Sequence, residues 1–152
     1  MGANFPRTYG IYQVKGGGRF TENKCSDLTY SYLVNSALYP TNIESNEIEI
    51  NEPAITSLAA IYINNSIYPV IEINQNEIYD NTHQYLSPAA IYSRTSSNVS
   101  MVGNKIFGFK NGILGIYSRN THIANNDINQ CESIGIYFYS PPNDNSIQLH
   151  CL

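Results

Sequence analysis

Apolar residues recur at every second position along much of the chain, which is the spacing of a β-strand. The segment "NEIEINE", from Asn46 to Glu52, is a clear example, because its isoleucines alternate with polar residues. Alternation places successive side chains on opposite faces of a sheet. No stretch of sequence carries an apolar period of 3.6 residues long enough for a crossover helix. The pattern therefore predicts short strands joined by turns.

The alternating segments share a repeated phrase, in which an apolar residue is followed three positions later by Asn and two positions after that by a second apolar residue. The steps between these asparagines vary from 19 residues (Asn126 to Asn145) to 30 (Asn46 to Asn76), which places the insertions in loops. The six copies are centred on Asn23, Asn46, Asn76, Asn104, Asn126 and Asn145. A second phrase, a small residue followed by Ile-Tyr, begins at Gly10, Ala60, Ala90, Gly115 and Gly135.

A repeat unit of two or three strands, without helices, predicts a solenoid. Coils stacked about 4.8 Å apart pair each strand with the equivalent strand of the next coil and enclose a shared apolar interior. Identical residues then lie in columns, so Ile stacks on Ile inside. The repeated Asn is expected at a bend, in the left-handed conformation that Asn tolerates, with its side chain bonded to the Asn of the next coil.

These repeats resemble the right-handed parallel β-helix family, whose repeats read much like "GIYSRNTHIANNDI", from Gly115 to Ile128. The resemblance covers about Phe20 to Ile147. It implies an all-β, right-handed, single-stranded parallel β-helix of about six coils. Residues 1–19 would supply a first strand and a Gly-rich turn, and residues 20–152 the repeats.

The family includes pectate lyases, polygalacturonases, alginate epimerases, phage tailspikes and carbohydrate-associated repeat proteins. The resemblance thus implies a sugar-related role and an extracellular, cell-surface or virion-associated location. The opening "MGANFPRTYGIYQVKGGGRF" lacks the amphipathic pattern of the helix that usually caps such a solenoid. Because open ends are aggregation edges, a neighbouring domain or a partner chain, as in a homotrimer, is expected to cover them.

Composition narrows the function classes. The 152 residues fit one domain, and with a net charge of −4 and 13% charged residues the chain lacks the basic footprint that nucleic-acid binding needs. No apolar run approaches the roughly 18 residues of a membrane span, so no membrane partner is expected. The three cysteines show no metal-binding or redox spacing, and no metal site or cofactor is predicted.

Strand alternation predicts two columns on the outer surface. The inward Ile of each small-Ile-Tyr phrase turns the next residue outward, which gives a column of Tyr62, Tyr92, Tyr117 and Tyr137. Two positions further lie Asn64, Arg94, Arg119 and Tyr139. Aromatic rings suit the apolar faces of sugars, and a guanidinium suits a carboxylate or sulfate, so an acidic polysaccharide is the predicted ligand. Alternatively, the tyrosines stabilise neighbouring strands or pack against a partner chain.

Catalytic and metal-binding interpretations have less support in the sequence. Glu47 and Glu77 follow the ladder Asn in consecutive coils, but Lys105 and Asp127 continue that column, which favours an ordinary solvated face over the acid pair of a glycosidase. Three aspartates do not share a column as calcium ligands would: Asp80, Asp127 and Asp144. The histidines, at positions 83, 122 and 150, are isolated and are interpreted as turn or surface residues.

The cysteines have structural interpretations. Cys25 occupies a repeated Ile position and is expected to fill the core as a small apolar residue. Cys131 and Cys151 would meet across adjacent coils, although free thiols are the favoured interpretation.

Three functions therefore remain open, and the catalytic residues of the second are not identified. The first is a carbohydrate-recognition or surface-attachment module. The second is a polysaccharide lyase, glycoside hydrolase or epimerase. The third is a structural module of a trimeric tailspike or fibre.

Overall fold

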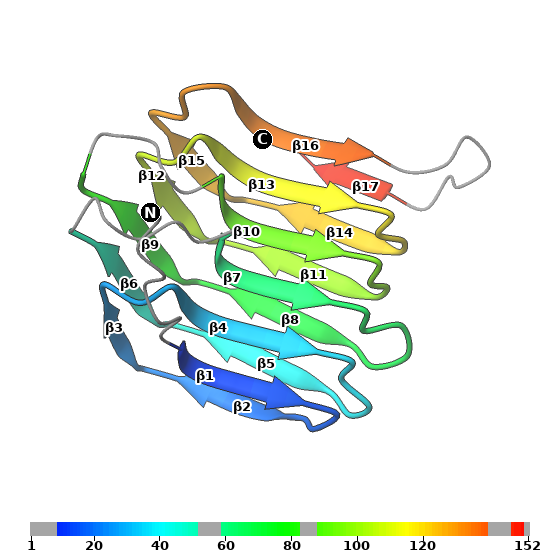
Figure 1. Ribbon diagram of the computed structural model, residues 1–152. Helices are drawn as coiled ribbons and strands as arrows, with labels where there is room; N and C mark the ends of the chain where they lie inside the picture. The colour runs from blue at the N-terminus through cyan, green and yellow to red at the C-terminus, as the bar shows by residue number, and fades with distance from the viewer. Residues whose placement is uncertain (1–8, 52–58, 83–87, 140–146, 151–152) are drawn as a thin grey trace, which may run out of the picture.

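The computed structural model describes residues 9–51, 59–82, 88–139 and 147–150. The described chain winds repeatedly through three strand directions, as Figure 1 shows. All strand pairings are parallel, and each strand pairs with equivalent strands of the adjacent coils. None of the described residues belongs to a helix long and apolar enough to cross a membrane.

Three sheets form the walls of the solenoid. Sheet A contains β1 (Tyr9–Val14), β4 (Tyr30–Asn35), β7 (Ala59–Asn64), β10 (Ala89–Arg94), β13 (Asn111–Ile116) and β16 (Ile134–Tyr139). Sheet B contains β2 (Gly18–Thr21), β5 (Thr41–Glu44), β8 (Ile71–Asn74), β11 (Val99–Val102), β14 (Thr121–Ala124) and β17 (Ile147–His150). Sheet C contains β3 (Lys24–Ser26), β6 (Glu47–Ile50), β9 (Glu77–Asp80), β12 (Lys105–Phe107) and β15 (Asp127–Asn129).

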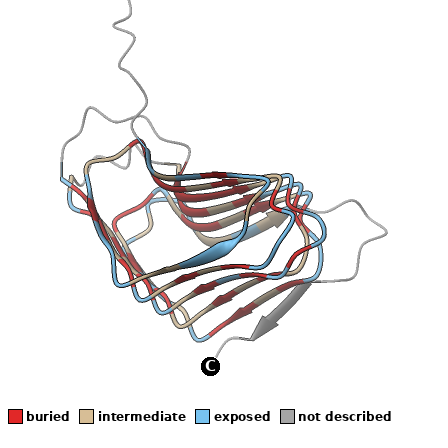
Figure 2. Ribbon diagram, turned by 90° about the horizontal axis from the view of Figure 1, so that it is seen from below, coloured by how far each residue is buried: buried red, intermediate tan, exposed pale blue. Residues whose placement is uncertain are grey.

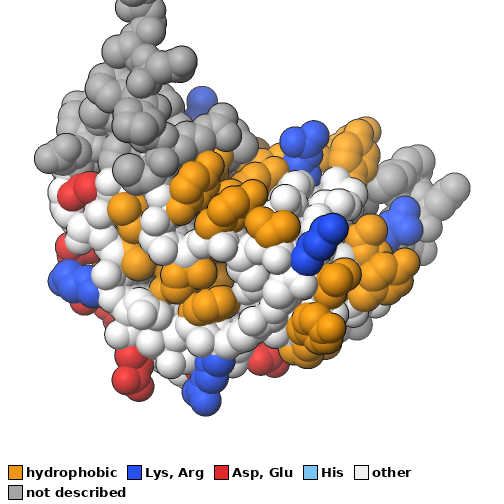
Figure 3. All heavy atoms as spheres, turned by 60° about the horizontal axis from the view of Figure 1, so that its bottom comes forward, with side chains coloured by type: hydrophobic (Ala, Val, Ile, Leu, Met, Phe, Trp, Pro, Cys, Tyr) orange, Lys and Arg blue, Asp and Glu red, His pale blue; other side chains and the backbone are white. Residues whose placement is uncertain are grey.

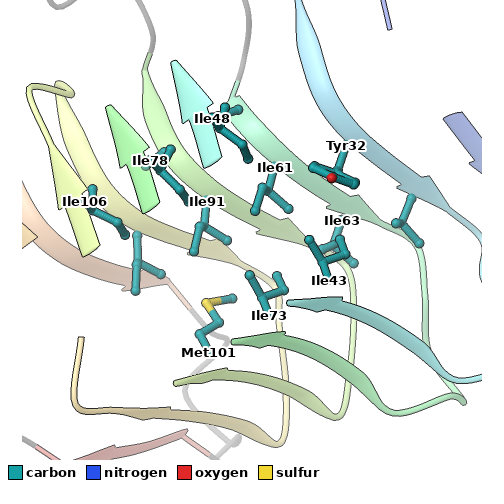
Figure 4. Packing of buried hydrophobic residues seen from close by; sticks show 14 of the residues in the cluster. Tyr32, Ile43, Ile48, Ile61, Ile63, Ile73, Ile78, Ile91, Met101 and Ile106 are labelled. Atoms are coloured by element: carbon teal, nitrogen blue, oxygen red, sulfur yellow. The ribbon is translucent and has the colours of Figure 1, made fainter. Parts of the chain in front are cut away.

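The interior is a column of β-branched and other apolar side chains, which Figure 4 shows in detail. Figure 2 shows the coils end-on, with the buried residues in red. In sheet A, Ile61 pairs with Ile91, which pairs with Ile113, and all three side chains are fully buried. The other sheets contribute equivalent columns, so the predicted stacking of Ile on Ile is confirmed. Cys25 pairs with Ile48 and is buried in this core, as its place in the repeat predicted.

The repeated asparagines form the predicted ladder at the bend between sheets B and C. The side-chain amide of Asn76 donates to Oδ1 of Asn104 at 2.9 Å, and Asn46 donates in the same way to Asn76 at 2.9 Å. The row runs from Asn23 to Asn126. Asn145 lies outside the described residues.

One detail of that prediction is wrong, because the ladder Asn does not itself take the left-handed conformation. The residue before it does: Ser45 has a φ of 55° and Gln75 also has a φ of 55°. With the bend made one position earlier, the amide of the ladder Asn turns inward, where Asn76 and Asn104 are fully buried. There each amide replaces the backbone partners that the bend removes.

Candidate functional site: the outer face of sheet A and the adjoining turns

The register of sheet A tests the predicted tyrosine column. Tyr62 pairs with Tyr92, as expected. The next residue in the column is Leu114, and Tyr137 follows it. Tyr117 therefore does not belong to this column.

Tyr117 is displaced because the Gly115-Ile116-Tyr117 phrase is not the segment that aligns with Ala90-Ile91-Tyr92. Gly112-Ile113-Leu114 aligns instead, which places Tyr117 beyond the strand, in the turn to sheet B with a φ of 55°. The second column is affected in the same way: Asn64 pairs with Arg94, Arg94 with Ile116, and Ile116 with Tyr139.

Arg119 is also absent from the second column, and the prediction of two stacked arginines is wrong. Arg119 lies in the turn and forms a parallel bridge with Ser97. Among the described residues, Arg94 is thus the one arginine that the register places on the outer face of sheet A, at the C-terminal end of β10.

The outer face carries a longer stack of aromatic rings than the sequence predicted. Ring centroids lie 5.6 Å apart between Tyr9 and Tyr30, 5.9 Å between Tyr30 and Tyr62, and 5.0 Å between Tyr62 and Tyr92, with nearly parallel planes. Tyr12 extends the stack beyond Tyr9. Offset stacking at these distances stabilises adjacent strands.

Tyr9, Tyr12 and Tyr30 were not predicted as site residues. Of these three, Tyr30 is the hardest to predict from the sequence, because strict alternation places it on the same face as Tyr32. In the structure Tyr32 lies in the core, whereas Tyr30 packs in the outer cluster. Tyr30 and Tyr62 are only 5% and 8% exposed, so the middle of the stack is structural, as the alternative interpretation of the tyrosines held.

Arg94 lies beside Tyr92, the last ring of the stack. The Tyr62 hydroxyl accepts a hydrogen bond from its guanidinium, and this bond, followed by the nearby Tyr62, Tyr92 and Tyr117 hydroxyl groups, raises the pKa of Arg94 above its ordinary value. The same Tyr62 hydroxyl donates to Oδ1 of Asn64 at 3.3 Å. The Arg94 cation is therefore close to the hydroxyl groups of three tyrosines.

A hollow of about 270 Å³ adjoins this group on the turns between sheets A and B. It arises because the turn after β7 spans residues 65–70, whereas the next turn spans only residues 95–98 and leaves a step. We call this feature the turn hollow; it is lined by Ile67, Thr95, Ser97, Tyr117 and Arg119. The predicted residues Tyr117 and Arg119 thus come together here.

Figure 3 shows how charge and apolar surface are distributed on one side of the molecule. Acidic side chains lie along the left and lower margins of this view, with Lys or Arg beside them, and hydrophobic side chains extend from its centre to its right, where other Lys and Arg side chains lie among them. The right of the view is the side of the turns between sheets A and B. Apolar residues on those turns are strongly exposed: Leu38 by 56%, Tyr39 by 64% and Tyr68 by 83%.

The predicted carboxylate column is confirmed in sheet C, where Glu47 pairs with Glu77, Glu77 with Lys105 and Lys105 with Asp127. Lys105 Nζ lies 2.8 Å from Glu77 Oε1, and Lys24 Nζ lies 2.6 Å from Glu47 Oε1. The hydrogen bond from Lys105 lowers the pKa of Glu77, with a further contribution from Tyr79. A general acid needs the opposite shift, so the contacts of Glu77 are those of a surface ion pair.

Among the other charged groups of the described residues, Arg19 pairs with Glu44 at 3.1 Å. Within those residues no three His, Cys, Asp or Glu side chains are grouped as metal ligands. His122 lies on sheet B, paired with Ser100. Cys25 and Cys131 are free thiols whose pKa is raised by burial. Positions 83, 144 and 151, and the side chain of residue 150, lie outside the described set.

The comparisons with known proteins agree with this architecture. The model of the family described as "Right handed beta helix region" matches residues 9–151, which is nearly the whole chain. No curated protein and no solved structure matches the chain significantly. Parallel strands stacked in three sheets, an internal Asn ladder and this match together show that the chain belongs to the right-handed β-helix family.

Proposed function

We propose that the chain is a carbohydrate-recognition module that binds an acidic polysaccharide on the outer face of sheet A, near the C-terminal ends of its strands. The observation that carries the proposal is the environment of Arg94. Its side chain is exposed, and the Tyr62, Tyr92 and Tyr117 hydroxyl groups lie near enough to raise the pKa of its guanidinium. The guanidinium offers paired donors to a carboxylate or sulfate, and the rings offer apolar faces to the sugar.

The surroundings of Arg94 favour an extended ligand. Asn64 precedes Arg94 in the column and Tyr139, which is 49% exposed, follows two positions later. Tyr137 is 40% exposed in the neighbouring column. These side chains present amide and hydroxyl groups beside aromatic surface, which is the combination that sugar rings require.

A glycan array weighted toward uronic-acid and sulfated polymers tests the proposal. The wild-type chain is compared with Arg94→Gln, which removes the charge, and with Lys110→Gln, which removes one positive charge from a distant exposed site. Binding that Arg94→Gln weakens about tenfold and Lys110→Gln preserves is expected, because a charge-assisted hydrogen bond contributes about 1.5–3 kcal/mol. Equal binding by both variants would contradict the proposal.

A structural module of a fibre is the second candidate, and the exposed turn residues favour it. Leu38, Tyr39, Ile67, Tyr68 and Val70 expose apolar surface on two consecutive turns. Contiguous exposed apolar surface of this kind often marks a protein interface. In light-scattering measurements this candidate predicts a trimer that Tyr39→Ser with Tyr68→Ser dissociates, whereas a wild-type monomer would exclude it.

A further inference from the structure

We infer that the turn hollow is a second subsite for an anionic sugar unit. A bound acidic polysaccharide would then pass from sheet A around the turn toward sheet B. This inference rests on the proposed function. It adds a position at which the ligand is held, and it predicts the direction in which the ligand lies.

The residues that line the turn hollow supply three kinds of chemical group. Ile67 is 46% exposed and Tyr117 is 49% exposed, so apolar surface is available at two walls. Thr95 and Ser97 add hydroxyl groups, which both donate and accept hydrogen bonds. Arg119 adds a guanidinium at the same opening. An apolar wall, hydroxyls and one fixed cation match a sugar ring that carries a carboxylate or sulfate.

Tyr117 connects the turn hollow with the surroundings of Arg94, because it is close to both. The Tyr117 ring packs edge-on against Tyr139 at a centroid distance of 5.5 Å, and the Tyr117 hydroxyl group contributes to the raised pKa of Arg94. Tyr117 also lines the hollow. Thr95, on the same wall, directly follows Arg94 in the chain. One ligand can therefore contact both places without leaving the protein surface.

The two arginines lie on different coils and at different positions along the coil. Arg119 is paired with Ser97, three residues beyond Arg94. At about 3.3 Å per extended residue, Ser97 lies no more than about 10 Å from Arg94, and the step to Arg119 on the next coil adds about 4.8 Å. That separation suits two anionic groups on one polymer better than two groups on one sugar ring.

The backbone of the hollow also limits what can vary there. Thr95 and Tyr117 have positive φ angles of 48° and 55°, a conformation that side chains larger than Gly or Asn adopt rarely. A β-branched Thr and a bulky Tyr in such positions are strained. The same conformation occurs at Lys15, Ser36 and Asn65, the first residues after β1, β4 and β7, so it belongs to the repeated turn and places Thr95 and Tyr117 at equivalent positions of adjacent coils.

The test uses size-defined oligogalacturonates and heparin-derived sulfated oligosaccharides, each from disaccharide to octasaccharide, with affinities measured by isothermal titration calorimetry. Two variants act on the hollow: Arg119→Gln removes the cation, and Ser97→Leu fills the space. Arg94→Gln acts on the first subsite, and Lys110→Gln is the charge-matched control. Circular dichroism establishes that each variant is folded.

The expected result depends on ligand length. Arg119→Gln and Ser97→Leu weaken the longer oligomers about tenfold and leave the shortest unchanged, whereas Arg94→Gln weakens every length. The two ligand series identify whether a carboxylate or a sulfate is the anion. If Arg119→Gln and Ser97→Leu match Lys110→Gln at every length while Arg94→Gln still weakens binding, the second subsite is refuted and the proposed function stands. Absence of wild-type binding to both series refutes both.

Discussion

Replacing the buried ladder residue Asn76 with Ala removes four hydrogen bonds at once. Its Nδ2 donates to the Ile43 carbonyl at 2.9 Å and to Asn104 Oδ1 at 2.9 Å. Its Oδ1 accepts from the Asn46 backbone amide at 3.1 Å and from Asn46 Nδ2 at 2.9 Å. Each bond contributes about 1 kcal/mol net, so the free energy of unfolding should fall by about 4 kcal/mol.

Part of the network survives in the Ala variant and sets the lower limit of the loss. Asn46 Nδ2 keeps the Phe20 carbonyl at 3.0 Å, and Asn104 Oδ1 keeps the backbone amide of residue 76 at 3.0 Å. The Asn46 backbone amide loses the acceptor described for it and remains buried, which by itself costs about 1–3 kcal/mol. A loss of at least about 2 kcal/mol is therefore expected.

Asn23→Ala is the matched control, because Asn23 occupies the same ladder at the first coil and is exposed. Its amide nitrogen donates to the Thr21 carbonyl at 3.1 Å and to Asn46 Oδ1 at 2.9 Å, and water can replace the first bond. The expected loss is about 1 kcal/mol. Urea unfolding, followed by circular dichroism and by fluorescence of the 13 tyrosines, measures both variants. Equal losses in the two variants would refute the burial argument.

Three further predictions concern the ion pair, a close contact and the aromatic stack. The pKa of Glu77 is lowered in the folded state, so its ion pair with Lys105 contributes its full stabilisation above the ordinary carboxyl pKa. That stabilisation is lost as the pH falls through the folded-state pKa of Glu77. Because the Glu77 side chain is 44% exposed, Glu77→Gln should lower the free energy of unfolding by under about 1 kcal/mol at pH 7 and leave it unchanged near pH 2, as measured by urea unfolding at both pH values. Gly112→Ala should cost about 1–3 kcal/mol, because a Cβ there would lie 2.5 Å from the Gly135 carbonyl oxygen. Gly135→Ala should cost much less in thermal unfolding, because its Cβ would lie 3.9 Å from Ile128 Cγ2, an ordinary contact distance. Tyr62→Ala should destabilise by about 3 kcal/mol or more and Tyr137→Ala by less, because Tyr62 is 8% exposed and Tyr137 40%; similar unfolding midpoints would contradict the structural role of the stack.

The features that recur in every coil were predictable from the sequence. The Ile columns, the Asn ladder and the Glu47–Glu77–Lys105–Asp127 column all follow from one phrase whose internal spacing is constant. Within that phrase the bend is short and its length does not change, so identical positions in sequence are identical positions in space. The pairings and hydrogen bonds within such a segment can therefore be predicted without knowing the lengths of the loops.

The positions of Tyr117 and Arg119 were not predicted, because turn length varies between sheets A and B. A spacing signal was nevertheless present. Thirteen residues separate Ile91 from Asn104, and the same interval before Asn126 ends on Ile113, not on Ile116. Measured from the ladder Asn, the aligned segment is therefore Gly112-Ile113-Leu114, and Tyr117 belongs to the turn. No comparable signal identifies Tyr30, whose outward position depends on the bend at the start of its strand.

The rings of the tyrosine stack differ in burial, so within one stack some rings have a structural role and others can contact a ligand. Tyr30 and Tyr62 are inaccessible, so their stacking energy holds coils together and contributes no contact surface. Tyr92 is half-buried, adjoins Arg94 and ends the stack where Leu114 interrupts the column. Beyond that interruption, exposed rings reappear only with Tyr117, Tyr137 and Tyr139 among the described residues that follow. Exposed rings thus lie at both ends of the outer face, at Tyr9 and Tyr12 and again near Arg94, and the second end combines them with a guanidinium and the turn hollow. Tyr92→Ala should therefore weaken ligand binding with little loss of stability, whereas Tyr62→Ala should lower the stability with little direct effect on binding. This pair of results would distinguish recognition from stacking within the same column.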